Sequence, residues 1–278
     1  MLIILSTPIG NLSDISVRAI NVLKDAKVIA CEDTRVTKKL LSLLNISLSC
    51  KFISYNDHNG EKVRPKLLKI LKNEQVILMS DAGTPLISDP GYKLVKACYK
   101  KEIPITAIPG PSSPIVALTL SGLPTNKFVF NGFVPIKPSV IRKQFSLSAS
   151  LEMTQIWFEV PRRLITTLEI MLEIYGNRNC CVLRELTKLH EEKIHGSIKD
   201  LIYKYSSSKI IRGEIVIIIE GVNNNSDFDK KRIEKELQKL LQFQKLNDAA
   251  REVANNHGYK KNDVYKIGLK LKQELKYK

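Results

Sequence analysis

The segment Ser80–Gly91, which reads SDAGTPLISDPG, holds two glycines, two prolines and two aspartates directly after the apolar run Val76–Met79. Glycine lets a backbone approach a bound molecule closely, and proline makes the backbone rigid. In an open α/β sheet, a loop of this kind at the end of a strand commonly admits a ligand. A long surface turn can have the same composition. The segment alone leaves a ligand-binding loop and a plain turn both open.

Other kinds of site find little support in the spacing of motifs. No GxGxxG follows the first apolar run and no GxxxxGK[ST] occurs, which disfavours an ordinary dinucleotide site and a P-loop. His190 and His195 are five residues apart, which on a helix places them on different faces, so we expect no metal site there. Five cysteines without a CxxC indicate neither a disulfide framework nor zinc binding, and suit reducing cytoplasm.

Length and charge limit the class of protein. A chain of 278 residues with 44% hydrophobic residues is long enough for two domains with cores of their own. No apolar run approaches the roughly eighteen residues of a membrane span, so we expect a soluble intracellular protein that does not bind membranes. The net charge of +16 favours a polyanionic partner, although a general bias toward lysine would also raise it. Residues 229–278 hold fourteen Lys or Arg against seven Asp or Glu, and this uneven distribution favours nucleic acid.

The first 120 residues alternate short β-branched runs with amphipathic segments, a pattern that predicts a mostly parallel sheet. The carboxyl ends of its strands share one edge, so SDAGTPLISDPG would form a cleft with TPIGN, EDTR and PGPSS. Asp14 is a suitable N-cap for the first helix, which Ile15, Ala19, Val22 and Leu23 mark by their spacing. The predicted strands are Leu2–Ser6, Lys27–Cys31, Lys51–Tyr55, Val76–Ser80 and Ile105–Ile108.

A second set of strands follows a predicted linker at 121–125, and a helical region follows a second linker at 223–227. We therefore predict an α/β protein with an N-terminal domain over 1–120, a second α/β domain over 125–222 and a basic helical module over 229–278. The strands expected in the second domain are Phe128–Phe130, Gln155–Phe158, Cys181–Leu183 and Glu214–Ile219.

Seven motifs together resemble one known family. TPIGNLSDIS, EDTR, SDAGTPLISDPG, IPGPSS, FNGFVP, RELTKLHEE and GEIVIIIEG resemble, in order and spacing, the ribosomal RNA small subunit methyltransferase I family of tetrapyrrole methylase-like, class III methyltransferases. The resemblance runs from Leu2 to about Val222, and the basic ending is similar as well. It implies S-adenosylmethionine in a cleft between two α/β domains and 2'-O-methylation of a cytidine ribose in the decoding region of small-subunit ribosomal RNA. It also implies a cytoplasmic homodimer.

The resemblance assigns donor contacts by matching motif. Small residues in these loops would let the backbone approach the nucleoside and the methionine part of the donor. Where the family usually has PHR, this chain reads Pro161-Arg162-Arg163, so no role of that histidine carries over. The implied donor-binding residues are Ile9, Gly10, Ala82, Gly83, Thr84, Ile87, Ser112, Ser113, Phe158 and Leu186.

Methylation of a ribose hydroxyl depends largely on placing two atoms in line, helped by a carboxylate that accepts the proton or a cation that favours the alkoxide. The candidates are Glu32, Asp33 and Arg35 in EDTR, with Glu185 and Lys188 in RELTK. EDTR could instead cap a helix through Asp33 or Thr34, and RELTK could form an interdomain salt bridge. Candidate phosphate contacts are Lys137, Arg142 and Lys143, which could equally belong to a solvated loop.

Two other functions stay open at this stage. A methyltransferase of the same fold could act on a corrin or porphyrin precursor and would not need the basic residues. A nucleic-acid-binding protein without catalytic activity could keep the cleft as a vestige.

Overall fold

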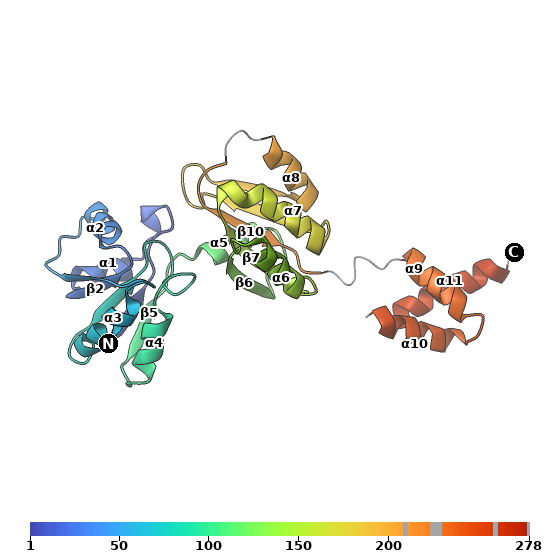
Figure 1. The fold of residues 1–278 in the computed structure, drawn as a ribbon, viewed down its shortest axis with the longest axis horizontal. Coiled ribbons are helices and arrows are strands. Elements are labelled where there is room, and N and C mark those ends of the chain that lie inside the picture. The colour runs from blue at the N-terminus through green and yellow to red at the C-terminus, as the bar shows by residue number, and fades with distance from the viewer. Residues whose placement is uncertain (208–210, 223–229, 258–260, 277–278) are drawn as a thin grey trace. The chain divides into compact units, whose positions relative to one another are not determined.

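The computed structural model describes residues 1–207, 211–222, 230–257 and 261–276. The chain divides into two compact units, the first of Met1–Ala149 with Met153–Glu220 and the second of Ser150–Glu152 with Gly221–Lys278. The first unit contains two five-stranded sheets and the second contains helices (Figure 1). The expected α/β fold with a C-terminal helical part is confirmed.

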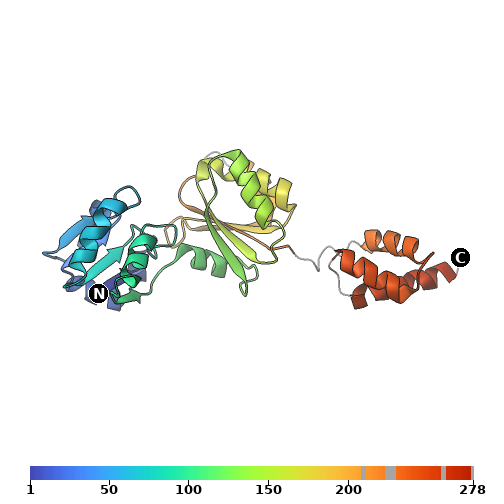
Figure 2. The same ribbon diagram turned by 60° about the horizontal axis from the view of Figure 1, so that its bottom comes forward.

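The first sheet is parallel throughout, as the sequence predicts, with the order β3-β2-β4-β1-β5. Helices α1 and α2 pack against one face, where Leu23 and Leu41 join the core, and α3 and α4 pack against the other through Leu67 and Leu94 (Figure 2). The strands are β1 (Leu2–Leu5), β2 (Val28–Cys31), β3 (Lys51–Ser54), β4 (Val76–Met79) and β5 (Ile105–Ile108), and the helices are α1 (Val17–Lys24), α2 (Thr34–Leu43), α3 (Gly60–Ile70) and α4 (Tyr92–Tyr99).

The N-caps of the first two helices test the capping predictions. Asp14 is not the cap of α1, because it ends a 3-10 turn, η1 (Leu12–Asp14), and the side chain of Ser16 accepts the hydrogen bond from the Ala19 N–H instead. Asp33 does cap α2, since its carboxylate accepts from the Arg35 N–H at 2.8 Å. The alternative that EDTR starts a helix is therefore confirmed.

The second sheet is mixed, with the order β6-β7-β10-β8-β9, and only β6 and β7 run parallel. Helices α6, α7 and α8 bury residues such as Phe145, Leu168 and Leu201 on one face, while α5 packs on the other through Ala117 and Leu118. The elements are α5 (Ser113–Leu120), β6 (Phe128–Phe133), α6 (Pro138–Ser148), β7 (Thr154–Glu159), η2 (Pro161–Arg163), α7 (Leu164–Tyr175), β8 (Asn179–Arg184), β9 (Glu192–Ser197), α8 (Ile198–Ser206) and β10 (Ile215–Ile219).

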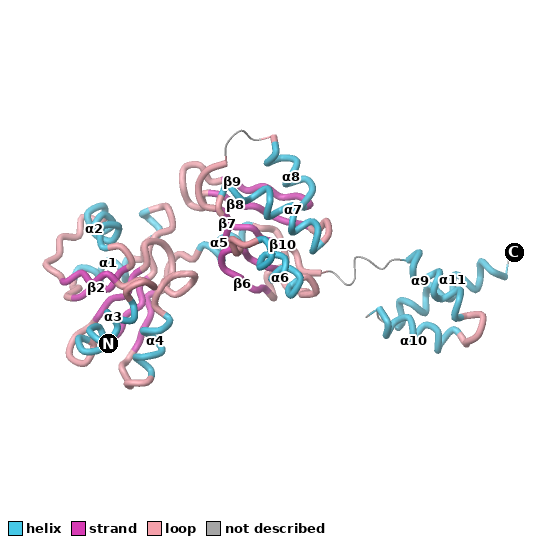
Figure 3. Tube along the Cα trace, viewed as in Figure 1, coloured by secondary structure: helices cyan, strands magenta, loops and turns pink. Residues whose placement is uncertain are grey.

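The second unit is a cluster of helices (Figure 3). Its core joins Leu237 of α9, Val253 of α10 and Leu271 of α11. Gly268 lets α11 approach α10 closely, because a side chain there would collide with Leu246. The helices are α9 (Lys230–Leu240), α10 (Leu246–His257) and α11 (Lys261–Lys276).

Candidate functional site

The loops that follow β1, β4 and β5 form one hydrogen-bonded framework. Thr7 and Gly83 exchange two backbone hydrogen bonds, of 2.8 Å and 3.1 Å. The Thr84 hydroxyl donates to the Pro111 carbonyl at 2.9 Å, and its oxygen lies 3.0 Å from that of Ser6. TPIGN, SDAGTP and PGPSS, which the sequence places at one sheet edge, are thus tied together at that edge.

A cavity of about 350 Å³ lies beside these loops, within the size range of small-molecule sites, about 300 to 1,000 Å³. Its walls come from both sheets of the first unit. Six of the implied donor-binding residues line it, namely Ile9, Ala82, Ile87, Ser113, Phe158 and Leu186. Nine further residues, which are not among the donor contacts that the resemblance implies, complete the lining: Ser88, Asp89, Phe133, Glu159, Val160, Gly213, Glu214, Ile215 and Val216.

The other four implied donor-binding residues support the walls. Gly10 packs against the loop after β8, where an added Cβ would lie 2.8 Å from Thr187 Oγ1 and 3.0 Å from the Leu186 carbonyl oxygen. Gly83 has a φ of +80°, and a Cβ there would meet Ile9 at 3.2 Å. Thr84 makes the hydrogen bonds described above, and Ser112 occupies the N-cap position of α5.

The segment between Thr84 and Gly91 has an unusual backbone. Leu86 and Ser88 have φ values of +74° and +65°, a region that non-glycine residues rarely adopt, and Gly91 has +141°. Such conformations are retained where surrounding structure enforces them, often at binding sites. Here they accompany the exposure of Ile87, Ser88 and Asp89 to the cavity. An apolar side chain such as Ile87, 41% exposed at a cavity wall, is suited to contact with a ligand.

The three candidate residues of EDTR do not line the cavity. Asp33 and Arg35 pair with each other at 2.6 Å, and hydrogen bonds from Arg35 lower the pKa of Asp33 to about 2. The Asp33 N–H donates to the Asp81 carboxylate at 3.1 Å. Burial, with the negative charges of nearby aspartates, raises the pKa of Glu32. Asp33 is therefore a helix cap with little tendency to accept a proton.

Glu185 and Lys188 form a local ion-pair network at the edge of the cavity. Glu185 Oε1 accepts from the Glu214 N–H at 2.9 Å and from Lys188 Nζ at 3.0 Å, and Lys188 also pairs with Glu214 at 3.0 Å. The Glu214 N–H is the main reason that the pKa of Glu185 is lowered. Glu185 and Lys188 follow β8 and Glu214 precedes β10, so these ion pairs lie within one predicted domain. They do not form the interdomain salt bridge that the sequence left open as an alternative to catalysis.

The three candidate phosphate contacts belong to α6, with Lys137 at its N-cap position and Arg142 and Lys143 near its middle. Lys137 and Lys143 are exposed, but Arg142 forms an ion pair with Glu173 of α7. The segment is largely a helix rather than the loop that the sequence suggested. Arg142 is exposed as well, but Glu173 holds its guanidinium, whereas no ion pair among the described residues holds Lys137 or Lys143.

A buried ion pair holds the wall that Phe133 and Glu159 provide. Arg163 pairs with Glu159 at 2.7 Å and donates to the carbonyls of Val134 and Pro135 at 3.0 Å and 2.7 Å. The Thr167 hydroxyl donates to the same carboxylate at 2.6 Å. Arg163 is the last residue of the Pro161-Arg162-Arg163 motif, and it orients this wall, whereas Arg162 is exposed.

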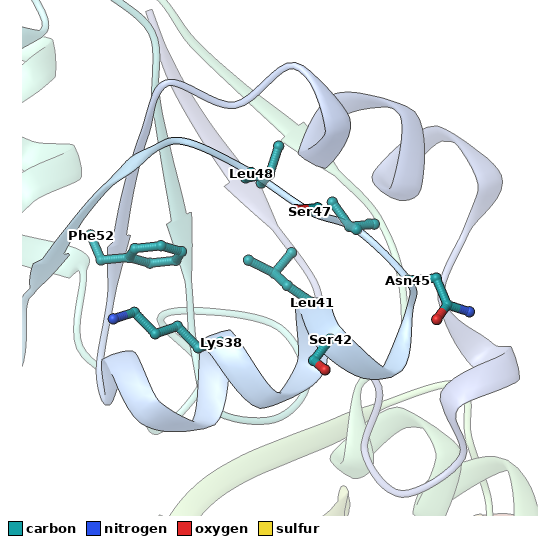
Figure 4. A pocket seen from close by; sticks show the side chains of 8 residues that line it. Lys38, Leu41, Ser42, Asn45, Ser47, Leu48 and Phe52 are labelled. Atoms are coloured by element: carbon teal, nitrogen blue, oxygen red, sulfur yellow. The ribbon is translucent and has the colours of Figure 1, made fainter.

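A second hollow, of about 520 Å³, lies between α2 and the segment before β3. Lys38 lies over the Phe52 ring, with 5.2 Å between Nζ and the ring centroid (Figure 4). None of the predicted site residues lines it. In the described part of the chain, no cluster of three or more His, Cys, Asp or Glu could hold a metal ion, and no helix is long and apolar enough to cross a membrane.

Comparison with known proteins connects the site to one family. Residues 1–202 match the family described as Tetrapyrrole (Corrin/Porphyrin) Methylases, and residues 229–272 match the RsmI C-terminal HTH domain. The chain is 46% identical to the Ribosomal RNA small subunit methyltransferase I of Rickettsia prowazekii (strain Madrid E), over 87% of this chain and 84% of that protein. It is 40% identical to the protein of the same name from Mesorhizobium japonicum, over 98% and 92%.

Among solved structures, a crystal structure of diphthine synthase is similar with a TM-score of 0.59, covering 80% of this chain and 90% of that one. At 14% sequence identity, this similarity shows a shared fold alone.

Proposed function

We propose that this chain, which belongs to the ribosomal RNA small subunit methyltransferase I family within the tetrapyrrole methylases, methylates small-subunit ribosomal RNA with S-adenosylmethionine as the donor. The acceptor atom is the 2'-oxygen of a cytidine in the decoding region, as the seven motifs imply. The observation that carries the proposal is the cavity at the carboxyl ends of the parallel strands, which the family's motifs line in this chain. The function would be exercised in the cytoplasm.

The cavity is chemically suited to S-adenosylmethionine. Its apolar side chains, among them Ile9, Phe158 and Leu186, can cover a nucleoside, and the small side chain of Ala82 leaves the backbone accessible. The charged residues that line it, Asp89, Glu159 and Glu214, are all acidic, which agrees with a cationic donor. When bound, the donor supplies a methyl group activated by attachment to a positively charged sulfur.

The chain contributes mainly by holding the reacting groups in line. Fixing two reactants at contact distance can supply a large part of the rate acceleration of such a transfer. The framework of Thr7, Gly83 and Thr84 keeps the first-sheet wall rigid, and the pair of Glu159 and Arg163 keeps the opposite wall in place. Closure of the cavity by RNA would also exclude water.

The basic parts of the chain supply the contacts to RNA. Lys137 at the N-cap of α6 and Lys143 within that helix are exposed, and the helical unit matches a domain described as HTH. Lysines on such surfaces bind phosphates independently of sequence. We propose that a homodimer carries two helical units, which together bind the assembled small subunit more tightly than one could.

The test is methylation of small ribosomal subunits purified from cells that lack the protein. With labelled S-adenosylmethionine we expect one methyl group per subunit, on a cytidine 2'-oxygen of the decoding region, mapped by nuclease digestion and mass spectrometry. Large subunits serve as the control and naked RNA as a weaker substrate. Donor binding by calorimetry without transfer to any RNA would contradict the proposal. Transfer to a corrin or porphyrin precursor would replace it by the alternative substrate, and absence of donor binding would indicate a protein that only binds nucleic acid.

A further inference from the structure

Three carboxylates line the cavity, and they differ in what surrounds them. They are Asp89 after β4, Glu159 at the end of β7 and Glu214 before β10. A ribose hydroxyl that receives a methyl group must lose its proton, and a carboxylate near the hydroxyl can accept it. A carboxylate whose oxygens are already held by a cation or by several donors is a weaker base.

Glu159 and Glu214 are both engaged. Glu159 accepts hydrogen bonds from the Val160 N–H and the Thr167 hydroxyl, each at 2.6 Å, and pairs with Arg163. Glu214 pairs with Lys188. Outside the cavity lining, Glu185 is held by Lys188 and Asp33 by Arg35. None of these four carboxylates is free to act as a base without breaking an existing pair.

Asp89 is different, because no Lys, Arg or His in the described part of the chain pairs with it. It follows Ser88, whose φ of +65° is one of the left-handed values of this segment, and precedes Pro90, so its backbone is closely restricted. The charged groups of the neighbouring elements are Asp81, Glu32 and the paired Glu159 and Glu214. A partly buried carboxylate is thus held at the cavity wall among other acids.

Burial raises the pKa of Asp89 to about 6, against a hydrogen bond from Ser80 that lowers it and with a further increase from Asp81. The group is therefore ionised at neutral pH and yet more basic than an ordinary aspartate. A base whose pKa approaches the working pH is the more effective one. Asp33, with its pKa lowered to about 2, shows the opposite case at the same sheet edge.

We propose that Asp89 is the proton acceptor of the methyl transfer. As the bond between the ribose 2'-oxygen and the methyl carbon forms, the carbon–sulfur bond breaks and its electron pair stays on sulfur. The hydroxyl proton passes to a carboxylate oxygen of Asp89 and later to solvent. This inference rests on the proposed function, since it requires a hydroxyl as the acceptor. It assigns the base to the loop SDAGTPLISDPG and not to EDTR or RELTK.

The experiment compares Asp89→Asn with the wild-type chain in single-turnover methylation of small subunits, with donor affinity measured by calorimetry. Asparagine keeps the shape and removes the basic oxygen, so we expect the transfer rate to fall about 10²- to 10⁴-fold. The donor Kd should rise by less than about tenfold, because Glu159 and Glu214 still give the cavity its negative charge. Asp57→Asn is the matched control, because Asp57 is an exposed carboxylate that follows β3 at the same sheet edge and lies outside the cavity lining. We expect that control to keep the wild-type rate.

The pH profile separates a base from a residue that merely supports the loop. The wild-type rate should rise with pH and level off above neutrality, the Asp89→Asn rate should lose that rise, and Asp89→Glu should restore part of the rate together with the rise. A wild-type rate in Asp89→Asn, loss of donor binding in it, or an unchanged pH profile at a lower rate would overturn the assignment. Failure of the wild-type chain itself to methylate subunits would instead contradict the proposed function.

Discussion

The cavity that we propose for the donor and the C-terminal helical unit that we propose for RNA are built in two opposite ways. The cavity is formed by loop backbone and apolar side chains, and the charged residues in its lining are acidic. On α11 of the helical unit, Val264, Ile267 and Leu271 are buried, whereas Lys266 and Lys270 lie one turn apart and face solvent. The two ligands that we propose, a small cationic donor and a large polyanion, would require such different surfaces. If the proposed function holds, donor binding and RNA binding should be separable by mutation.

The largest effect is expected from filling the cavity. Ala82→Leu places a branched side chain at an exposed position of the wall, where it would remove a close contact and block the site. We expect donor affinity to fall more than about 100-fold, which corresponds to a loss of about 3 kcal/mol of binding free energy. Position 82 is a better choice for this substitution than position 83. Gly83 has a φ of +80°, and a side chain there would be strained and would press against Ile9. Calorimetry measures the affinity, and a thermal scan checks the fold.

Ala107→Leu is the control for this change, because Ala107 is an exposed alanine of β5 outside the cavity lining. It should bind the donor as the wild type does. Unchanged affinity in a folded Ala82→Leu variant would show that the cavity is not the donor site.

Removal of the helical unit should have the next largest effect, and only on RNA. In a chain of residues 1–222, the whole lining of the cavity is retained. We expect a donor Kd within about twofold of the full chain and methylation of assembled subunits slower by about 10- to 100-fold, equivalent to about 1.4 to 2.8 kcal/mol of lost binding. Initial rates at limiting subunit concentration measure this. An equal rate would place RNA recognition in the first unit.

The sequence predicted the strands well because each is a short apolar run bounded by turn residues. The ends of all five strands of the first sheet agree within one residue at either end. β9 was missed, since its exposed Lys193 and His195 alternate with buried Ile194 at the edge of the sheet and resemble a polar loop. Asp14 was mistaken for a helix cap because Asn11 starts a separate 3-10 turn just before α1.

The candidate site was only partly predictable, for a physical reason. Loops that follow strands of a parallel sheet meet at one edge, so TPIGN, SDAGTPLISDPG and PGPSS could be placed together from the sequence. Glu159 and Ile215 meet in the lining because β7 and β10 pair in antiparallel register, which brings the end of one strand to the start of the other. The alternation of apolar and polar residues along a strand does not show which other strand it pairs with. It also does not show which carboxylates are held by cations.

A smaller effect, on the salt dependence of RNA binding, should distinguish two pairs of exposed lysines, Lys266 with Lys270 on α11 and Lys137 with Lys143 of α6. Changing Lys266 and Lys270 to Gln should reduce the slope of log affinity against log salt concentration by up to about two phosphate contacts. Changing Lys137 and Lys143 to Gln should reduce that slope by no more than the same amount. Lys93 and Lys96 of α4, changed together, serve as a charge-matched control and should leave the slope unaltered. Filter binding to small subunits at several salt concentrations measures all three. A loss of slope in the α4 pair alone would reverse the assignment of the RNA-binding face.

The smallest expected effect concerns stability and follows from the same Asp89 that we assign to catalysis. Its pKa in the folded chain, about 6, lies above the ordinary value of 3.8, so the folded state retains the proton over a pH range in which the unfolded state has lost it. The contribution of Asp89 to stability is therefore complete below about pH 4 and is lost as the pH rises through 6. Asp89→Asn, which removes the burial of a charge, should raise the Tm at pH 8 by about 2 °C and by nothing measurable at pH 4. Thermal scans of Asp89→Asn and Asp57→Asn at both pH values test this difference. An equal Tm for the two variants at pH 8 would mean that Asp89 is fully solvated, and a fully solvated Asp89 would lack the raised pKa that supports its assignment as the base.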